Sequence, residues 1–128
     1  MQQNISYTNV VTEVFDFFTR KINECKQAGI NDIIVDPGFG FGKTAGNNFE
    51  LLRNLQAFKM LGKPILAGLS RKSTIYKTLN VSAEEALNGT TVLNTLALNN
   101  GVDIIRVHDV REAVEAVTLL CTYKTIAS

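Results

Sequence analysis

Polar side chains able to bind a ligand gather in three short segments of the sequence, and an apolar run precedes each segment. The segments are Asp36-Pro37-Gly38-Phe39-Gly40-Phe41-Gly42-Lys43, Ser70-Arg71-Lys72 and Arg106-Val107-His108-Asp109. A carboxylate can accept two ring N–H groups, whereas arginine, lysine and histidine can hold phosphate or carboxylate groups. The three segments therefore predict a site for an anionic substrate with an amidine-like or pteridine-like edge.

The apolar runs before these segments predict three short buried strands, at 33–35, 64–69 and 104–107. Four helices are expected as well: over 10–25, from about Asn48, from the capping box Ser82-Ala83-Glu84-Glu85, and from Asp109 as the N-cap of the last. Apolar strands that alternate with helices are typical of a parallel sheet covered on both faces.

The spacing of the polar segments indicates the architecture. Asp36 and Ser70 lie 34 residues apart and Ser70 and Arg106 lie 36 apart, close to the roughly 31 residues expected when about 250 residues form eight barrel units. We therefore predict an α/β fold that is the C-terminal part of a (β/α)8 TIM barrel, with three parallel strands alternating with four helices. Residues 1–128 would form one partial domain, with the N-terminal half absent. The alternative is a small open sheet that oligomerises through its unpaired edges.

In a parallel sheet of this kind, ligands bind at the carboxyl ends of the strands, where the following loops meet. Arg106 and His108 are two residues apart, so a strand presents both side chains on one face. Gly68, Ser70 and Lys72 share a face in the same way. We expect these side chains to converge with the carboxylate after the first strand.

Each candidate also has a purely structural explanation. Asp36 precedes a Pro-Gly pair and is a suitable turn residue. Arg71 and Lys72 suit a solvated face, and His108, the single histidine of the chain, suits a structural role. Arg106 is harder to explain in this way, because a charge among apolar neighbours is costly to bury without a partner. Three polar strand ends in matching positions favour function.

The glycine-rich segment does not form a Walker loop, because that motif requires a glycine where this chain has Pro37. The run from Gly40 to Ala45 matches the G-x-G-x-x-A pattern of dinucleotide-binding folds, but no acidic residue ends the next strand. The glycines instead let the loop carry Phe39 and Phe41 over a flat ligand. The alternative is that both phenylalanines anchor the loop to the body of the protein.

The composition excludes several classes of protein. Thirteen Lys and Arg against twelve Asp and Glu give a net charge of +1, which argues against nucleic-acid and anionic-membrane partners. No apolar run is long enough for a transmembrane helix or marks a signal peptide. Cys25 and Cys121 stand alone, without metal-ligand spacing. We expect a cytoplasmic protein with reduced cysteines.

Taken together, the three polar segments resemble dihydropteroate synthases of folate biosynthesis in both order and spacing. The resemblance covers essentially all 128 residues. Asn48 followed by Leu51-Leu52 and Leu55 is similar to the family's helix after the glycine-rich loop. Met1-Gln2 resembles the end of an internal loop motif, so Met1 is not expected to be the natural start.

The resemblance implies a transferase that joins 6-hydroxymethyl-7,8-dihydropterin diphosphate to p-aminobenzoate and releases 7,8-dihydropteroate and diphosphate. The pterin would be bound by Asp36, Lys72 and Arg106, and the diphosphate by Arg106 and His108. The p-aminobenzoate would be bound by Phe39, Phe41, Ser70, Arg71 and Lys72. Catalysis would rest on Lys72, Arg106 and His108. The family also implies a homodimer and a Mg²⁺ ion, whose protein ligand would lie outside this chain.

Two other functions are open at this stage. A pterin-binding barrel of the methyltetrahydrofolate–corrinoid methyltransferase type shares the fold and an aspartate on the pterin edge. It would not need Ser70-Arg71-Lys72 and Arg106-Val107-His108 together. A half-barrel that binds a phosphorylated ligand without catalysis would use Arg106, His108 and Lys72. On the synthase hypothesis, the isolated chain is expected to be inactive.

Overall fold

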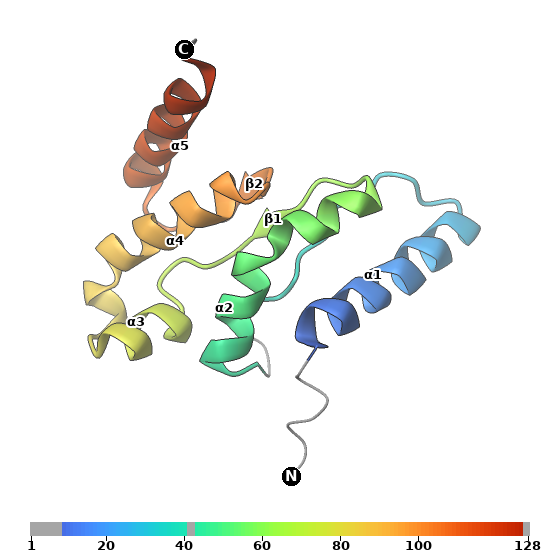
Figure 1. The fold of residues 1–128 in the computed structure, drawn as a ribbon, viewed down its shortest axis with the longest axis horizontal. Coiled ribbons are helices and arrows are strands. Elements are labelled where there is room, and N and C mark those ends of the chain that lie inside the picture. The colour runs from blue at the N-terminus through green and yellow to red at the C-terminus, as the bar shows by residue number, and fades with distance from the viewer. Residues whose placement is uncertain (1–8, 41–42, 127–128) are drawn as a thin grey trace.

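The computed structural model describes residues 9–40 and 43–126 of the chain. Along these residues helices predominate, and the extended segments are short (Figure 1). The elements are α1 (Val10–Gln27), α2 (Ala45–Arg53), the 3-10 helix η2 (Leu55–Leu61), β1 (Leu66–Ala67), α3 (Ser73–Leu79), the 3-10 helix η3 (Ala83–Glu85), α4 (Leu87–Asn99), β2 (Ile104–Ile105) and α5 (Val110–Thr125).

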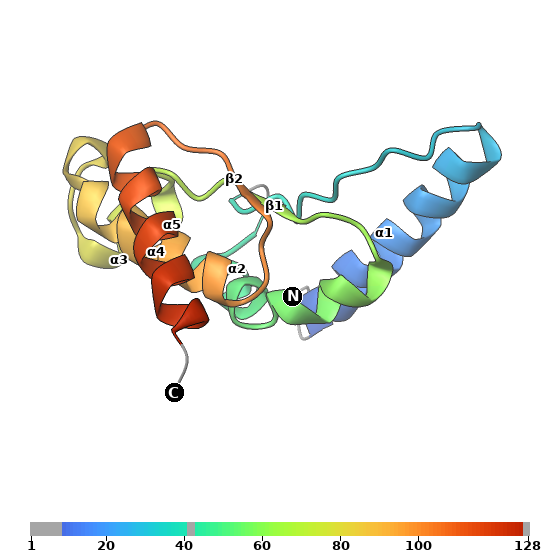
Figure 2. The same cartoon turned by 90° about the horizontal axis from the view of Figure 1, so that it is seen from above.

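A two-stranded parallel sheet lies at the centre of the described chain. β1 pairs with β2 in the register Leu66 to Ile104 and Ala67 to Ile105. A third extended segment pairs with the residue just before β1, through one parallel bridge between Val35 and Ile65. Figure 2 shows these extended segments on one side of α2.

The expected count of three parallel strands is therefore wrong in detail. The run 33–35 contributes a single bridge, in which the Val35 N–H donates to Pro64 O at 2.9 Å and Val35 O accepts from Leu66 N at 2.8 Å. Before Val35, the segment that comes from α1 lies away from β1 and approaches it only near Val35 (Figure 2). Ile34, which was expected to be buried, is 53% exposed. A regular strand needs a partner along its whole length, and only one residue of this run has one.

The helices also depart from the expected four, because α3 separates Lys72 from the capping box. α3 has seven residues, too few for an apolar periodicity to be visible in the sequence. The capping box itself is confirmed, since the Ser82 hydroxyl accepts from Glu85 N and the Glu85 carboxylate accepts from Ser82 N. It opens the one-turn η3, however, and α4 begins only after it. α2 begins three residues before the expected Asn48, at a second capping box formed by Thr44 and Asn47.

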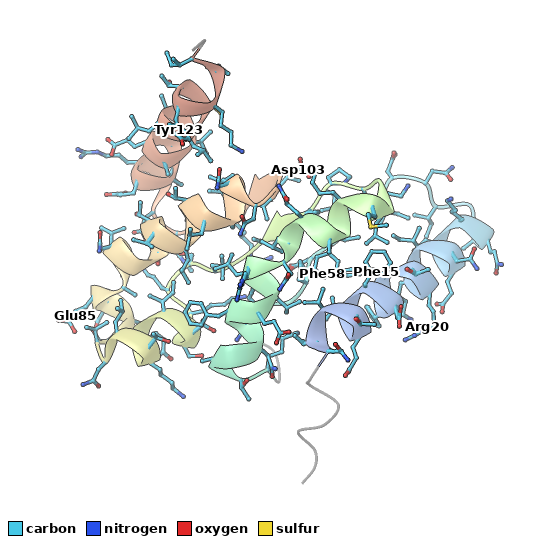
Figure 3. The ribbon with its side chains drawn as sticks, viewed as in Figure 1. Phe15, Arg20, Phe58, Glu85, Asp103 and Tyr123 are labelled. Atoms are coloured by element: carbon cyan, nitrogen blue, oxygen red, sulfur yellow. The ribbon has the colours of Figure 1, made fainter. Side chains whose placement is uncertain are left out.

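The core draws buried residues from α1 to α4, η2 and β1, and its aromatic part lies between α1 and η2. Phe58 of η2 is completely buried, and two rings of α1 pack on it. Phe15 stacks at 6.2 Å between ring centroids and Phe18 meets it edge-on at 5.8 Å. Figure 3 shows Phe15 and Phe58 facing each other between the two elements. These aromatic contacts hold α1 against the rest of the chain.

At the other end of the chain, α5 packs on α4 and projects beyond the remaining elements (Figure 1). An apolar groove of about 290 Å³ runs between α5 and β2. Its walls include Val107, Val110 and Val114, and the last two are 64% and 56% exposed. Among the described residues, no helix combines the length and apolar character that crossing a membrane requires.

The close approach of α3 to α4 at Gly89 gives the first prediction. A Cβ atom at Gly89 would lie 2.5 Å from Ile75 Cγ2 and 3.0 Å from Leu79 Cδ1. We expect Gly89→Ala to lower the free energy of unfolding by about 1–2 kcal/mol, because overpacking outweighs the gain in helix propensity. Urea unfolding followed by circular dichroism measures the change.

Gly46→Ala is the matched control, because the nearest atom to an added Cβ there is Thr44 Oγ1 at 3.7 Å. We expect it to leave the stability unchanged or to raise it. Equal effects of the two substitutions would contradict a packing constraint at Gly89.

Candidate active site

A small pocket of about 110 Å³ opens where β1 and β2 end. We call it the strand-end pocket; it is lined by Gly68, Ser70, Lys72, Arg106, Val107 and His108. The two strands are parallel and in register, so the residues that follow them leave the sheet side by side. The expected convergence of the polar segments after the second and third strands is therefore confirmed.

Asp36 is not one of the lining residues, but it pairs with Arg106, which is. Its Oδ2 lies 3.6 Å from Arg106 NH1, and its Oδ1 accepts a hydrogen bond from Gly38 N at 2.9 Å. The carboxylate thus closes the turn that starts the glycine-rich loop and also pairs with the arginine that follows β2. The side chains of Asp36 and Arg106 remain 36% and 58% exposed, so this ion pair leaves both groups accessible to a ligand.

The Arg106 side chain packs directly against Gly68. A Cβ atom at Gly68 would collide with Arg106 NH2 and lie 2.9 Å from its Cζ atom. The backbone of Gly68 does not adopt the left-handed conformation that only glycine accepts readily. The glycine is therefore explained by the guanidinium packed against it rather than by its backbone.

Lys72 joins the pocket to the glycine-rich loop. Its Nζ donates to Phe39 O at 2.8 Å. Partial burial lowers the pKa of Lys72, and the nearby Arg106 lowers that pKa further, while Asp36 acts in the opposite direction. Lys43 makes a similar bond from its Nζ to Gly38 O at 3.0 Å, and burial lowers its pKa too. The two lysines hold the loop through its carbonyl groups.

Ser70 contacts His108 in two ways. Its Oγ lies 2.7 Å from His108 Nδ1, and the His108 backbone N–H donates to the same oxygen at 3.3 Å. Ser70 is 7% exposed. The hydroxyl of this serine is thus engaged by the segment after β2, whereas the family resemblance implied a contact with p-aminobenzoate.

Arg71 is not among the residues that line the strand-end pocket. Its guanidinium binds both oxygens of Asp109 at 3.0 Å, and its NH1 donates to the carbonyls of Ala83 and Glu84. The hydrogen bond from Arg71 lowers the pKa of Asp109, and the same bond raises the pKa of Arg71. Arg71 is therefore not a solvated arginine; in this structure its guanidinium is engaged by the protein, and its role at a substrate stays a prediction.

The predicted capping role of the Asp109 side chain is also wrong. Asp109 occupies the N-cap position of α5, but its side chain makes no capping hydrogen bond. Both carboxylate oxygens are bound by Arg71 instead. A two-pronged bond to a guanidinium is stronger than one bond to a backbone amide, which explains the preference.

Of the two candidate phenylalanines, the structure describes Phe39. Phe39 is 1% exposed and belongs to the hydrophobic core. In this structure it anchors the glycine-rich loop, the alternative left open by the sequence, and presents no free ring face to a ligand. Phe41 lies outside the described residues.

Asn48 was given no site role from the sequence, but in the structure it connects the glycine-rich loop to α3. It is 2% exposed; its Oδ1 accepts from Gly40 N at 2.9 Å, and its Nδ2 donates to Thr74 Oγ1 at 2.8 Å. The amide thereby ties the glycine-rich loop to α3. An asparagine on the apolar stripe of a helix was the available signal, since a buried polar side chain requires partners.

Within residues 9–40 and 43–126, no group of three His, Cys, Asp or Glu side chains could hold a metal ion. Asp36 is the carboxylate that pairs with Arg106 of the pocket, and this arginine would repel a divalent cation. These residues do not form a Mg²⁺ site by themselves.

The fold and the pocket define a class of protein. The site lies at the carboxyl ends of parallel strands in an α/β sheet, where ligands of such folds bind. One exposed carboxylate pairs with Arg106, and Arg106 lines the pocket together with Lys72 and His108. Groups of these types have the chemistry to bind a ligand that combines hydrogen-bond donors with an anionic group.

The sequence profile described as "Pterin binding enzyme" matches residues 1–108. The chain belongs to this family. Among similar proteins, dihydropteroate synthase of Escherichia coli strain K12 is 43% identical over 122 residues, which cover 94% of this chain and 43% of that protein. Dihydropteroate synthase of Haemophilus influenzae is 45% identical over 112 residues, which cover 86% of this chain and 41% of that protein.

Solved structures give the same result for the fold. The Yersinia pestis dihydropteroate synthase superposes with a TM-score of 0.89 at 37% identity, over 91% of this chain and 49% of that one. The Xanthomonas albilineans enzyme in complex with 7,8-dihydropteroate gives 0.90 at 37% identity, over 93% and 47%. The chain thus spans less than half the length of these relatives, and it has the α/β fold of the part it matches.

The Arg71–Asp109 pair gives a prediction about acid stability. Because the folded-state pKa of Asp109 lies below its unfolded-state pKa of about 3.9, the pair stabilises the fold fully above that pH. The stabilisation is lost as the pH falls through the lower folded-state pKa. We expect Asp109→Asn to be less stable than the wild type at neutral pH, with a difference that shrinks in acid. Urea unfolding at a series of pH values measures it.

Asparagine keeps the shape of the side chain but removes its charge and one of the two acceptor oxygens that Arg71 binds, so the substitution reports on this pair. Glu115→Gln is the control, because the Arg111–Glu115 pair is 84% and 62% exposed and such pairs contribute little. A stability difference for Asp109→Asn that stays constant down to the acid limit would contradict the assignment.

Proposed function

We propose that this chain supplies the pterin- and diphosphate-binding part of a dihydropteroate synthase. The observation that carries the proposal is the exposed Asp36 carboxylate facing Arg106, with Lys72 and His108 on the same pocket. Support comes from the relatives. Those of E. coli and H. influenzae are named dihydropteroate synthase, and the X. albilineans enzyme has been solved with 7,8-dihydropteroate and with 4-aminobenzoic acid.

On this proposal Asp36 accepts hydrogen bonds from the N–H edge of the pterin. Its Oδ2 is not saturated by the 3.6 Å contact to Arg106, and a carboxylate is an acceptor only, which suits a donor edge. Arg106 stacks on the pterin ring, a use to which a flat guanidinium is suited. Lys72, held at Phe39 O, donates to the ring and borders the p-aminobenzoate pocket.

The leaving group is held by Arg106 and His108. In the reaction the p-aminobenzoate amine forms a C–N bond to the pterin methylene carbon. The C–O bond to the diphosphate breaks, the diphosphate leaves with the electron pair, and the amine loses a proton. In the transition state, positive charge develops on the methylene carbon and negative charge on the diphosphate. Cationic donors fixed beside the leaving group therefore stabilise the transition state more than the bound substrate.

Fewer residues are proposed to bind p-aminobenzoate than the family resemblance implied. Arg71 and Phe39 are engaged by the protein itself, and Ser70 by His108. Lys72 keeps its role at this site, and the role of Phe41 stays a prediction. The position of the chain as the C-terminal half of a TIM barrel, the Mg²⁺ ion, the homodimer and the cytoplasmic location also stay predictions.

A hybrid enzyme tests the proposal. This chain would replace the matching segment of the E. coli synthase, and diphosphate release would be measured with the pterin diphosphate and p-aminobenzoate. We expect p-aminobenzoate-dependent turnover. Asp36→Asn should lower kcat/KM by about 10- to 150-fold, because a charged hydrogen bond contributes about 1.5–3 kcal/mol.

Asp32→Asn is the matched control, since Asp32 is an exposed carboxylate of the same segment, on the far side of Val35. It should leave turnover unchanged. A folded hybrid without turnover would overturn the proposal. Should the hybrid not fold, titration of the 128-residue chain with 7,8-dihydropteroate decides, with binding expected to weaken in Asp36→Asn and not in Asp32→Asn.

The purified chain by itself is expected to make no dihydropteroate. Its strand-end pocket holds about 110 Å³, and the Arg106 side chain beside it is 58% exposed, so the site cannot exclude water or enclose two substrates. The same diphosphate-release assay at high chain concentration measures this. Turnover by the chain alone that Asp36→Asn abolishes would refute the expectation.

A further inference from the structure

The pairing of β1 with β2 continues through side chains after the backbone ladder ends. In the ladder, Leu66 pairs with Ile104 and Ala67 with Ile105. The contacts between Ser70 and His108 and between Arg71 and Asp109 have the same separation of 38 residues. Parallel register therefore decides which residue of the second polar segment meets which residue of the third.

At the first of these contacts the serine hydroxyl can satisfy both the backbone and the ring of His108. A hydroxyl has one donor hydrogen and two acceptor lone pairs. The His108 N–H uses one lone pair, at 3.3 Å. The hydrogen is then available for Nδ1, 2.7 Å from Oγ. When the hydroxyl donates to Nδ1, a neutral imidazole carries its proton on Nε2.

The second ring nitrogen matters because of the pocket that His108 lines. The same pocket contains Arg106 and Lys72, so the ligand it suits is an anion. A neutral histidine that binds an anion must present an N–H, whereas a bare Nε2 would direct a lone pair at the negative charge. An Nδ1 held as acceptor leaves Nε2–H as the donor.

We propose that Ser70 is a positioning residue that fixes the tautomer and orientation of His108, so that Nε2–H donates to the diphosphate of the substrate. This role rests on the proposed function and replaces the contact with p-aminobenzoate that the sequence suggested. Although Ser70 also lines the pocket, its hydroxyl acts on the imidazole ring and not on the ligand. It does so from the segment after β1 on the ring carried by the segment after β2.

The first test needs no ligand and uses the fact that His108 is the only histidine of the chain. The ¹⁵N shifts of its ring nitrogens would be recorded in the 128-residue protein at about pH 9, where an ordinary imidazole is neutral. We expect the Nε2–H tautomer in the wild type, a mixture of tautomers in Ser70→Ala, and recovery in Ser70→Thr, which keeps the hydroxyl.

Thr90→Val is the matched control. Thr90 is 2% exposed, and its hydroxyl accepts from Arg71 N at 3.0 Å, so the substitution removes a buried hydroxyl next to the same segment without touching His108. It should leave the tautomer unchanged. A wild type with the proton on Nδ1, or a Ser70→Ala spectrum like that of the wild type, would overturn the proposal whether or not the chain belongs to a synthase. Circular dichroism establishes that each variant is folded.

The second test separates the two possible roles of Ser70 in the hybrid enzyme. Ser70→Ala removes one neutral hydrogen bond, so it should raise KM for the pterin diphosphate or lower kcat by about 2- to 12-fold. KM for p-aminobenzoate should stay unchanged. Ser70→Thr should restore the wild-type values. A rise confined to KM for p-aminobenzoate would overturn the positioning role and support direct contact. An inactive hybrid would count against the proposed function alone, and the tautomer measurement would still decide the role of Ser70.

Discussion

The parallel register between β1 and β2 is the constraint on which the site depends. Only two residue pairs form the ladder, yet the same separation of 38 residues sets the contacts of Ser70 with His108 and of Arg71 with Asp109. A shift of one residue would turn alternate side chains to the opposite face. Such a shift would move Arg106 off Gly68 and separate the groups that line the pocket.

The glycine-rich loop is the second part of the site, and its position depends on contacts from three sides. Phe39 anchors it in the core, Asn48 binds the Gly40 amide, and Lys72 binds the Phe39 carbonyl. The loop brings Asp36 to Arg106 from outside the two-stranded sheet. Binding groups from three separate segments are thereby held at fixed positions without being buried, which leaves them accessible to a ligand.

Much of the architecture was accessible from local patterns. The helix over 10–25, the capping box at Ser82 and the convergence of the polar segments at 70–72 and 106–108 follow from side-chain periodicity and from the geometry of parallel sheets. The strand predicted at 33–35 is only a single bridge in the structure. Apolar β-branched residues indicate a propensity for extended backbone, but they do not show that a neighbouring strand will pair with it. α3 was missed because seven residues are too few to show a helical repeat.

The types of the chemical groups, their order, and the strand ends at which they would meet could be predicted from the residues, because these depend on residue identity and short-range spacing. The contacts of each group could not, because they form only in the folded chain. Arg71 binds Asp109, Ser70 binds His108, and Phe39 lies in the core. These choices depend on distances between residues far apart in the chain, which the register of the sheet and the packing of the loop fix together.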